Sequence, residues 1–329
     1  MGDVAMTVPV LRVFSKTYPE VKITVVSRKF FKPFFEDIPN CEFLTADVYG
    51  KHKHLGLLKL AKEAQEKEID TVADLHNVIR SKIITRYFHF KKIKTATIDK
   101  GRADKKALTR AENKEFYPLK TTFQRYADVF AELGFPIDLS QNTYPSRKRL
   151  PPRINALIGV EPKKIIGIAP FAAFKSKMYP LELMKEVINS LDALDRYRIF
   201  LFGGGKEEIA TLKNLEKKYS NVISIAGMFP FQDELALISN LDIMVSMDSG
   251  NGHLAAMMGI PVLTLWGVTH PFAGFAPFNQ QEENQLLANR KEFPLIPTSV
   301  YGNKYPKDYE NAMKTISPET VVKKIKEIL

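Results

Sequence analysis

The sequence has almost no cysteine, which limits the ways in which the chain can be stabilised. Its single cysteine, Cys41, cannot form a disulfide within the chain, so a fold built on disulfides is excluded. One unpaired thiol is typical of a reducing compartment. No apolar run approaches the roughly 20 residues of a membrane helix, and the first residues contain no signal-peptide core. We therefore expect a cytoplasmic protein that does not span a membrane.

Several motifs that would indicate other chemistries are also missing. No Asp-x-Asp occurs in the chain, although metal-dependent sugar transferases commonly use this motif to hold a divalent cation. His52 and His54 have no carboxylate or cysteine neighbour, so we predict no metal site and no cofactor. No G-x-G-x-x-G follows a strand near the start of either half, which disfavours a nicotinamide oxidoreductase. Zinc-type spacings and RNP-type aromatic strands are absent, which argues against nucleic acid as a partner.

Positive charge is in excess. The 329 residues include 48 Lys and Arg against 37 Asp and Glu, which gives a formal net charge of +11 and a pI near 9.4. Much of the excess lies in the first half, for example at residues 51–54 and 91–94. Such an excess favours anionic partners. We interpret it as affinity for an anionic membrane face or an anionic acceptor, with a plain solvated surface as the alternative.

Strand-like and helix-like segments alternate along the chain, which is typical of parallel α/β sheets. In the first half we predict strands at 22–26, 42–45, 69–73 and 94–98, and helices at 5–17, 57–66, 79–88 and 122–133. In the second half we predict strands at 165–169, 199–202, 222–225, 241–245 and 262–266, and helices at 181–191, 206–218, 233–239 and after Ser317. Prolines make 136–153 a linker. The pattern predicts two Rossmann-like domains, 1–150 and 151–329, facing across a cleft, and leaves open whether the last helix packs back on the first domain.

The order of the first elements is unusual. A doubly wound domain normally begins with a strand that becomes central in its sheet, whereas this chain opens directly on a helix. A missing central strand leaves both neighbours with unpaired backbone groups, at a cost of about 1–3 kcal/mol for each buried group. We therefore expect either that the first strand is missing from this sequence or that another element takes its place.

A polar, glycine-rich turn connects the strand at 241–245 to a short helix. Asp248, Ser249, Gly250 and His253 all lie on this turn. Ligands of open α/β sheets bind at the carboxyl ends of strands, and the N–H groups of a helix N-terminus suit a phosphate. We predict a site for an anionic, nucleotide-bearing ligand, in which Ser249 and Gly250 approach the diphosphate closely. Asp248 either binds a sugar hydroxyl or orders the loop, and His253 either donates to a phosphate or packs beneath it.

These residues belong to a pattern that covers nearly the whole chain. It comprises Gly2-Asp3-Val4 with Pro9, Asp74-Leu75 with Ser81, residues 177–181, and Asp248-Ser249-Gly250 with His253, Pro261, Gly267, Thr269 and Pro271. In this pattern the chain resembles the heptosyltransferases of glycosyltransferase family nine, which add heptose to the inner core of lipopolysaccharide. The resemblance implies a GT-B fold and an inverting, metal-independent transfer from ADP-heptose to a lipopolysaccharide core acceptor. It also implies that the protein is cytoplasmic and peripheral to the inner membrane, in contact with the anionic face of that membrane.

The resemblance assigns a base and a donor site. Asp3 matches the general base that deprotonates the acceptor hydroxyl, although aspartate also suits a simple helix N-cap. Lys177 matches a lysine on the donor phosphates, with Lys175 as a rival, and a cation there neutralises charge on a leaving diphosphate. Glu207 matches a glutamate that holds the nucleoside, although a charged first-turn residue is the alternative.

For the acceptor, the first half of the chain supplies the candidates. We select His76 and Arg80, because a guanidinium suits the carboxylate or phosphate of an inner-core sugar, while a plain surface arginine is the alternative. Asn77, Arg102 and Lys105 are further candidates.

One departure from the family keeps other functions open. Ala172 and Ala173 stand where the family often has small hydroxylated residues, which removes possible phosphate hydrogen bonds. A transferase for another nucleotide sugar or acceptor, or an inactive nucleotide-binding relative, is therefore the alternative function.

Overall fold

The computed structural model describes residues 1–329 and divides them into two compact units. Unit 1 comprises Met1, Asp3–Arg102 and Lys120–Tyr144, and unit 2 comprises Gly2, Ala103–Leu119 and Pro145–Leu329. The expected division at residue 150 therefore needs two corrections. The boundary lies between residues 144 and 145, and the segment 103–119 belongs to unit 2 although it is flanked by unit 1 on both sides.

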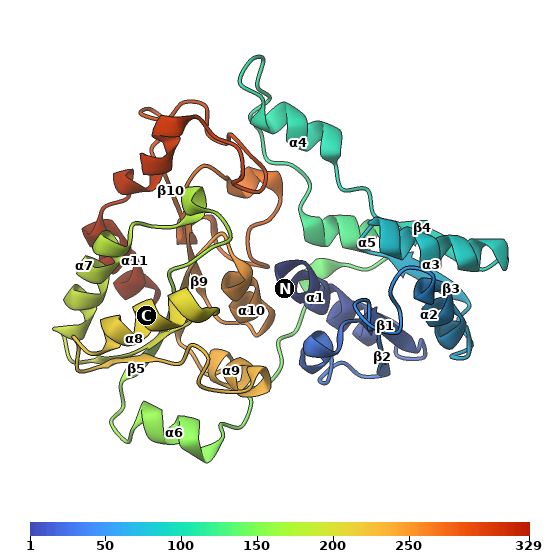
Figure 1. Ribbon diagram of the computed structural model, residues 1–329, viewed down its shortest axis with the longest axis horizontal. Coiled ribbons are helices and arrows are strands. Elements are labelled where there is room, and N and C mark those ends of the chain that lie inside the picture. The colour runs from blue at the N-terminus through green and yellow to red at the C-terminus, as the bar shows by residue number, and fades with distance from the viewer. The chain divides into compact units, whose positions relative to one another are not determined.

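Unit 1 contains the helices and strands predicted for the first half, with ends shifted by a few residues. The helices are α1 (Gly2–Thr17), α2 (Gly56–Gln65), α3 (Ile79–Phe90) and α5 (Thr122–Leu133). The strands are β1 (Ile23–Ser27), β2 (Cys41–Thr45), β3 (Thr71–Asp74) and β4 (Lys94–Thr97), as labelled in Figure 1. The helix α5 matches its prediction at both ends because the Thr121 side chain caps its start and Gly134, with φ of 101°, ends it.

The strands of unit 1 form two separate parallel sheets. β1 pairs only with β2, and β3 pairs only with β4. Each of β1 and β3 therefore keeps an unpaired edge, and Val26 of β1 is 38% exposed. Sheets of α/β domains are normally continuous, with inner strands paired on both sides. No strand of the chain joins these two sheets.

Unit 2 is built on one parallel sheet of six strands in the order β10-β9-β8-β5-β6-β7. The strands are β5 (Lys164–Ala169), β6 (Tyr197–Leu201), β7 (Val222–Ser224), β8 (Ile243–Met247), β9 (Val262–Trp266) and β10 (Gln285–Leu287). The helices that connect them are α7 (Leu181–Asp192), α8 (Lys206–Glu216), α9 (Phe231–Ile238) and α10 (Gly250–Met257). β8 and β9 are buried along their whole length, as expected for strands covered on both faces.

The order of this sheet reverses between β5 and β8. From β5 the chain continues outward through β6 and β7, and from β8 it continues in the opposite direction through β9 and β10. Open parallel sheets bind ligands at such a reversal, outside the carboxyl ends of the strands. The loops that follow β5 and β8 are therefore where the fold favours a ligand.

The last helix, α11 (Pro318–Ile328), packs within unit 2. Ser317 caps it, accepting the Thr320 N–H at 3.2 Å, and proline occupies its first position, as predicted. Val321 and Ile325 lie in the same apolar cluster as Val187 of α7. This helix is therefore part of the core of unit 2.

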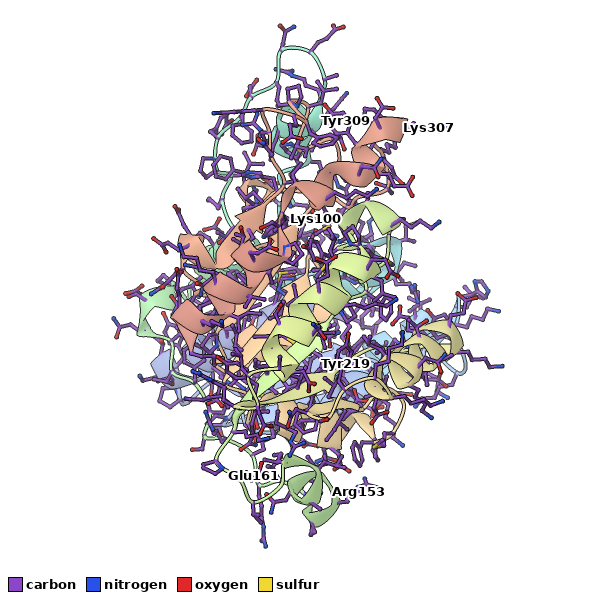
Figure 2. The ribbon with its side chains drawn as sticks, turned by 90° about the vertical axis from the view of Figure 1, so that its left-hand side faces the viewer. Lys100, Arg153, Glu161, Tyr219, Lys307 and Tyr309 are labelled. Atoms are coloured by element: carbon purple, nitrogen blue, oxygen red, sulfur yellow. The ribbon has the colours of Figure 1, made fainter.

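The expected linker contains little regular structure. Within residues 136–153 only the short turn η2 (Leu139–Gln141) and the start of α6 (Pro152–Ile158) are helical. Arg153 of α6, which is labelled in Figure 2, forms an ion pair with Asp233 of α9. Its guanidinium carbon lies 4.9 Å from the centre of the Phe229 ring. No helix of the structure has both the length and the apolar character needed to cross a membrane.

The segment 103–119 contains all but the first residue of the helix α4 (Arg102–Thr109), which was not predicted from the sequence. The segment packs through aromatic side chains. The ring of Phe116 lies 4.8 Å from that of Phe272, and the Leu119 N–H donates to the Phe272 carbonyl at 2.9 Å. The Lys114 ammonium donates to the Pro297 carbonyl at 2.7 Å. Backbone and side-chain contacts together explain why this segment is part of unit 2.

Candidate functional site

The loops after β5 and β8 meet at an ion pair. Lys177 lies in the turn η3 (Lys175–Lys177) after β5, and its Nζ is 3.1 Å from Oδ2 of Asp248, which follows β8. Thr269, which follows β9, donates its hydroxyl to the same oxygen at 3.0 Å. The side chains of Lys177 and Asp248 are only 12% and 11% exposed. Three strand ends thus place a cation, a carboxylate and a hydroxyl at one largely buried position.

Next to Asp248, α10 begins without a side-chain cap. Ser249 is the N-cap residue, but no N–H of the helix donates to its hydroxyl, which is buried without a hydrogen-bond partner. Gly250 is the first residue of the helix. The first N–H groups of a helix have no partners within it and carry partial positive charge. A buried free hydroxyl and an uncapped helix start suit an anion such as a phosphate.

The remaining two donor-site candidates differ in exposure. His253 lies one turn into α10 and is 8% exposed. Glu207 is exposed in the first turn of α8, after β6. Its neighbour Glu208 instead accepts the Gly204 N–H at 2.8 Å and orders the glycine-rich loop. The Glu207 carboxylate therefore stays available at a strand end, while the roles of both residues remain predictions.

The loop that carries Lys177 rests on a second loop, residues 299–303. Ser176 donates its hydroxyl to the Gly302 carbonyl at 2.5 Å, and the Gly302 N–H donates to the Ser299 hydroxyl at 3.0 Å. A Cβ at Gly302 would lie 2.6 Å from Cγ of Lys177, and the φ of Gly302 is +83°. Only glycine fits here without strain, so the second loop fixes the aliphatic stem of Lys177.

Gly267, directly after β9, supports the same loop, and we expect Gly267→Ala to destabilise unit 2. A Cβ at this position would lie 2.2 Å from the backbone carbonyl oxygen of Ser176, which cannot move without moving Lys177. Overpacking of this kind costs about 1–3 kcal/mol. Denaturant unfolding should show this loss, whereas Gly204→Ala, whose Cβ meets nothing within 4 Å, should be close to wild type. Equal stability of the two variants would contradict the prediction.

His270, next to Thr269, is buried in its neutral form. Burial, and then the charge of Arg290, lower the pKa of His270 to about 4, and the side chain is 3% exposed. Between pH 6.5 and 4 the unfolded chain therefore binds a proton that the folded chain does not, and stability falls as the pH drops through this window.

We expect His270→Gln to remove a pH-dependent part of the unfolding free energy that reaches about 3 kcal/mol. The measurement is denaturant unfolding of both proteins at pH 7 and pH 4. The exposed His54, replaced in the same way, is the control and should keep the wild-type pH dependence. An unchanged pH dependence in the His270 variant would refute the assignment.

On unit 1, Asp3 lies in the first turn of α1 but does not cap it. The N-cap is Met1 and no side-chain cap bond is present, so the alternative in which Asp3 is an N-cap is wrong. The Asp3 side chain is exposed. The Tyr126 hydroxyl donates to the Asp3 carbonyl at 3.4 Å, and burial together with the Asp3 charge raises the pKa of the Tyr126 phenol. Asp3 therefore sits beside a buried tyrosine with its carboxylate facing solvent.

The carboxyl end of β3 brings the acceptor candidates close to Asp3. Asp74 accepts the His76 N–H at 2.9 Å and shapes the turn after the strand. Burial lowers the pKa of His76; Lys100 and Arg80 act in the same direction, while Asp3 and Asp74 oppose it. The structure thus groups Asp3, His76 and Arg80 in one electrostatic neighbourhood, with His76 mainly neutral near pH 7.

Lys105 needs a correction. It lies in the segment 103–119 of unit 2 and is 7% exposed, with its Nζ 4.1 Å from the centre of the Phe275 ring. It therefore lies outside unit 1, while its role toward the acceptor stays a prediction. Thr269 belongs to the family pattern, but no role was predicted for it from the sequence. Its hydrogen bond to Asp248 joins residues that follow two different strands, and the sequence alone does not show such a contact.

The expectation that His52 has no carboxylate neighbour is wrong, because a glutamate distant in the sequence lies beside it. His52 is fully buried, and its Nε2 lies 3.2 Å from a carboxylate oxygen of Glu63. No three His, Cys, Asp or Glu side chains gather in a way that could hold a metal ion.

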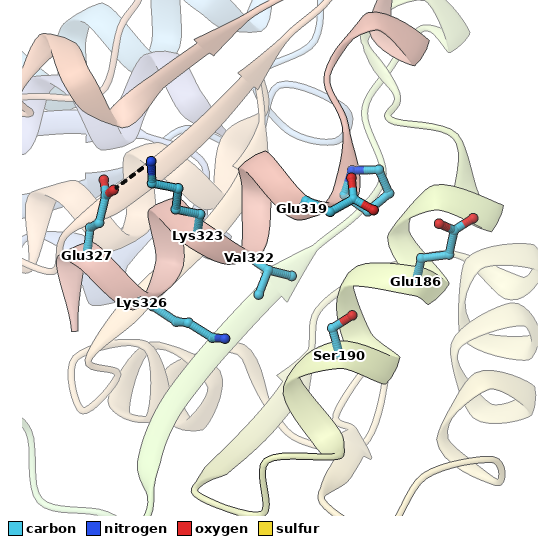
Figure 3. Close-up of a pocket in the computed structure, with 8 residues that line it drawn as sticks. Glu186, Ser190, Glu319, Val322, Lys323, Lys326 and Glu327 are labelled. Atoms are coloured by element: carbon cyan, nitrogen blue, oxygen red, sulfur yellow. Dashed lines mark ion pairs between the residues drawn. The ribbon is translucent and has the colours of Figure 1, made fainter.

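A pocket of about 600 Å³ lies away from these strand ends. It is formed between α7 and α11 and is lined by Glu186, Ser190, Pro318, Glu319, Val322, Lys323, Lys326 and Glu327 (Figure 3). Acidic and basic side chains are mixed on its walls, and none of the predicted site residues contributes to it.

Comparison with known proteins gives consistent results. The family described as glycosyltransferase family 9 (heptosyltransferase) matches residues 57–300. The lipopolysaccharide core heptosyltransferase OpsX of Haemophilus influenzae is 24% identical, over 100% of this chain and 94% of that protein. A glycosyltransferase family 9 structure from Veillonella parvula has a TM-score of 0.74 at 20% identity, covering 99% of this chain and 94% of the other.

Two structures of the Escherichia coli heptosyltransferase WaaC also match. The structure with ADP has a TM-score of 0.68 at 18% identity and covers 100% of this chain and 97% of the other. The structure with ADP-2-deoxy-2-fluoro heptose has a TM-score of 0.65 at 17% identity, with coverage of 100% and 96%. These likenesses confirm the expected two-domain GT-B fold.

Proposed function

Because the chain belongs to glycosyltransferase family 9, the heptosyltransferase family, we propose that it transfers heptose from ADP-heptose to a lipopolysaccharide core acceptor. The donor is supported by the WaaC structures, which hold ADP and an ADP-heptose analogue. The acceptor is supported by the relative OpsX, a lipopolysaccharide core heptosyltransferase. A different nucleotide sugar or acceptor is the alternative that Ala172 and Ala173 keep open.

The observation that carries the proposal is the arrangement of Lys177, Asp248 and Thr269 beside the uncapped start of α10. It lies at the reversal point of the sheet, where ligands of such folds bind. Lys177 and the N–H groups at Gly250 supply positive charge for the diphosphate. Asp248 holds Lys177 in place and can accept a hydrogen bond from a sugar hydroxyl, and Glu207 is placed to accept hydrogen bonds from the ribose.

In the proposed reaction, Asp3 accepts the proton of an acceptor hydroxyl while that oxygen attacks the anomeric carbon of the heptose. The bond from the anomeric carbon to the diphosphate oxygen breaks, and ADP leaves with the bonding electron pair. Attack on the face opposite the leaving group inverts the anomeric configuration. Charge on the leaving group is neutralised by Lys177 and the start of α10, so the mechanism requires no metal ion.

We also propose that the protein works in the cytoplasm at the inner face of the membrane. Its net charge of +11 favours an anionic lipid surface. Vesicles that contain phosphatidylglycerol should bind the protein at low salt and release it at high salt, while neutral vesicles should not bind it. Equal binding to both kinds of vesicle would contradict this part of the proposal.

Titration calorimetry with ADP, ADP-heptose, UDP-glucose and NAD, each without added metal, tests the donor. We expect selective binding of ADP and ADP-heptose. Mass spectrometry of a heptose-deficient lipopolysaccharide core after incubation with enzyme and ADP-heptose should then show the addition of one heptose. Preference for UDP-glucose would refute the donor assignment, and binding without any transfer would favour the inactive relative.

A further inference from the structure

Two arginines flank one exposed tyrosine on unit 1. The guanidinium carbons of Arg28 and Arg80 lie 5.4 Å and 5.8 Å from the centre of the Tyr49 ring. Arg28 follows β1, Tyr49 lies in the loop after β2, and Arg80 is in the first turn of α3, after β3. Three carboxyl ends of parallel strands therefore contribute one side chain each, at the edge where open sheets bind ligands.

No carboxylate neutralises the two arginines. Their contacts in the structure are with aromatic rings: Tyr49 for both, and Phe31 for Arg28 at 5.8 Å. The carboxylate of Asp47, two residues before Tyr49, accepts the N–H groups of Gly50 and Lys51 instead, at 3.0 and 3.1 Å. Two like charges at one ring repel each other, and an anion with several oxygens would relieve this repulsion through charge-assisted hydrogen bonds to each guanidinium.

The loop that presents Tyr49 is firmly held although Tyr49 itself is 71% exposed. The Asp47 N–H donates to Nδ1 of the buried His52 at 3.0 Å, and the other ring nitrogen of His52 pairs with Glu63 of α2. These contacts hold the backbone of the loop in place, so a ligand does not have to order it, which lowers the entropy cost of binding.

We propose that Arg28, Tyr49 and Arg80 form a subsite that binds an oxyanion group, a phosphate or a carboxylate, on the acceptor saccharide. This inference rests on the proposed function. The two guanidinium groups bind the anion, and the Tyr49 ring offers an apolar face to the adjoining sugar. Arg80 and Asp3 both act electrostatically on His76, so Arg80 and the proposed base belong to the same part of unit 1. An anionic group fixed here would orient a neighbouring hydroxyl toward Asp3.

Steady-state kinetics with a lipopolysaccharide core acceptor tests the subsite. We expect Arg28→Gln and Arg80→Gln each to raise the acceptor KM at least about tenfold, the loss of one charge-assisted contact, with the ADP-heptose KM unchanged. Tyr49→Ala should also raise the acceptor KM. Tyr49→Phe should have the wild-type acceptor KM, because the aromatic ring is kept. Arg86→Gln, an exposed arginine of the same helix α3, is the matched control and should behave as wild type.

Two modified acceptors identify the source of the anion. One is treated with phosphatase, and in the other the carboxylates are reduced to alcohols. With the acceptor that lacks the bound group, the acceptor KM of wild type should rise to that of the Arg28→Gln/Arg80→Gln double variant. The acceptor KM of the double variant should be the same with the modified and the unmodified acceptor. If transfer proceeds with the same acceptor KM in wild type and double variant, the subsite is refuted. If wild type transfers no heptose to any acceptor, the proposed function itself is refuted.

Discussion

Asp3→Asn is expected to lower the rate of heptose transfer by about 10²–10⁴-fold, the usual contribution of a positioned general base. The side chain keeps its size but loses its ability to accept the proton from the acceptor hydroxyl. ADP-heptose binding should be unchanged, because every residue that we propose for the donor belongs to unit 2. Single-turnover transfer and calorimetry on the same samples measure the two quantities separately.

A matched control separates base chemistry from helix electrostatics. Glu319 is also an exposed acid in a first helical turn, and Glu319→Gln removes a similar charge from a helix start. It should leave the transfer rate unchanged. If the Asp3→Asn variant transfers heptose at the wild-type rate, Asp3 is not the general base.

Lys177→Met is expected to abolish most activity and to destabilise unit 2. Loss of one group that stabilises the leaving charge costs about 10²–10³-fold in rate. Removal of one partner of a largely buried ion pair costs about 3–5 kcal/mol, because Asp248 is left with only the Thr269 hydroxyl. Lys175→Met, an exposed lysine of the same turn, should change neither quantity.

The double variant Lys177→Met/Asp248→Asn distinguishes the two effects. It leaves no unpaired buried charge, so its unfolding free energy should recover toward wild type, while transfer stays low. Recovery of transfer together with stability would show that Lys177 is a structural lysine and that the donor phosphates are held elsewhere.

The second half of the chain could be predicted well because local signals decide its structure. Buried strands such as β9 are continuous apolar runs, and its prediction at residues 262–266 is confirmed without change. Lys177 and Asp248 could each be predicted as site residues, because each follows the carboxyl end of a predicted strand, where open α/β sheets bind ligands. Their ion pair could not be predicted, since 71 residues separate them and only the order of the sheet places β5 beside β8.

In the first half of the chain, most helices and strands were predicted from the sequence, but the way in which they pack together was not. Arg28 and Tyr49 carry no motif, and only the parallel pairing of their strands brings them together near Arg80. The helix α4 was missed because it is short and polar, and its place is decided by contacts of Phe116 and Leu119 with Phe272, more than 150 residues away. Such contacts depend on the partner surface and leave no periodic signal in the segment itself.

The placement of residues 103–119 in unit 2 has a consequence for how relatives of this protein can recombine. A crossover at residue 150 would combine the donor half of one protein with the 103–119 segment of another. The buried ring of His270 would then face a foreign residue in place of Phe116, which lies 5.1 Å from it. Chimeras that fold should therefore take residues 103–119 and 145–329 from the same parent protein, although residues 120–144 separate these two segments in the sequence.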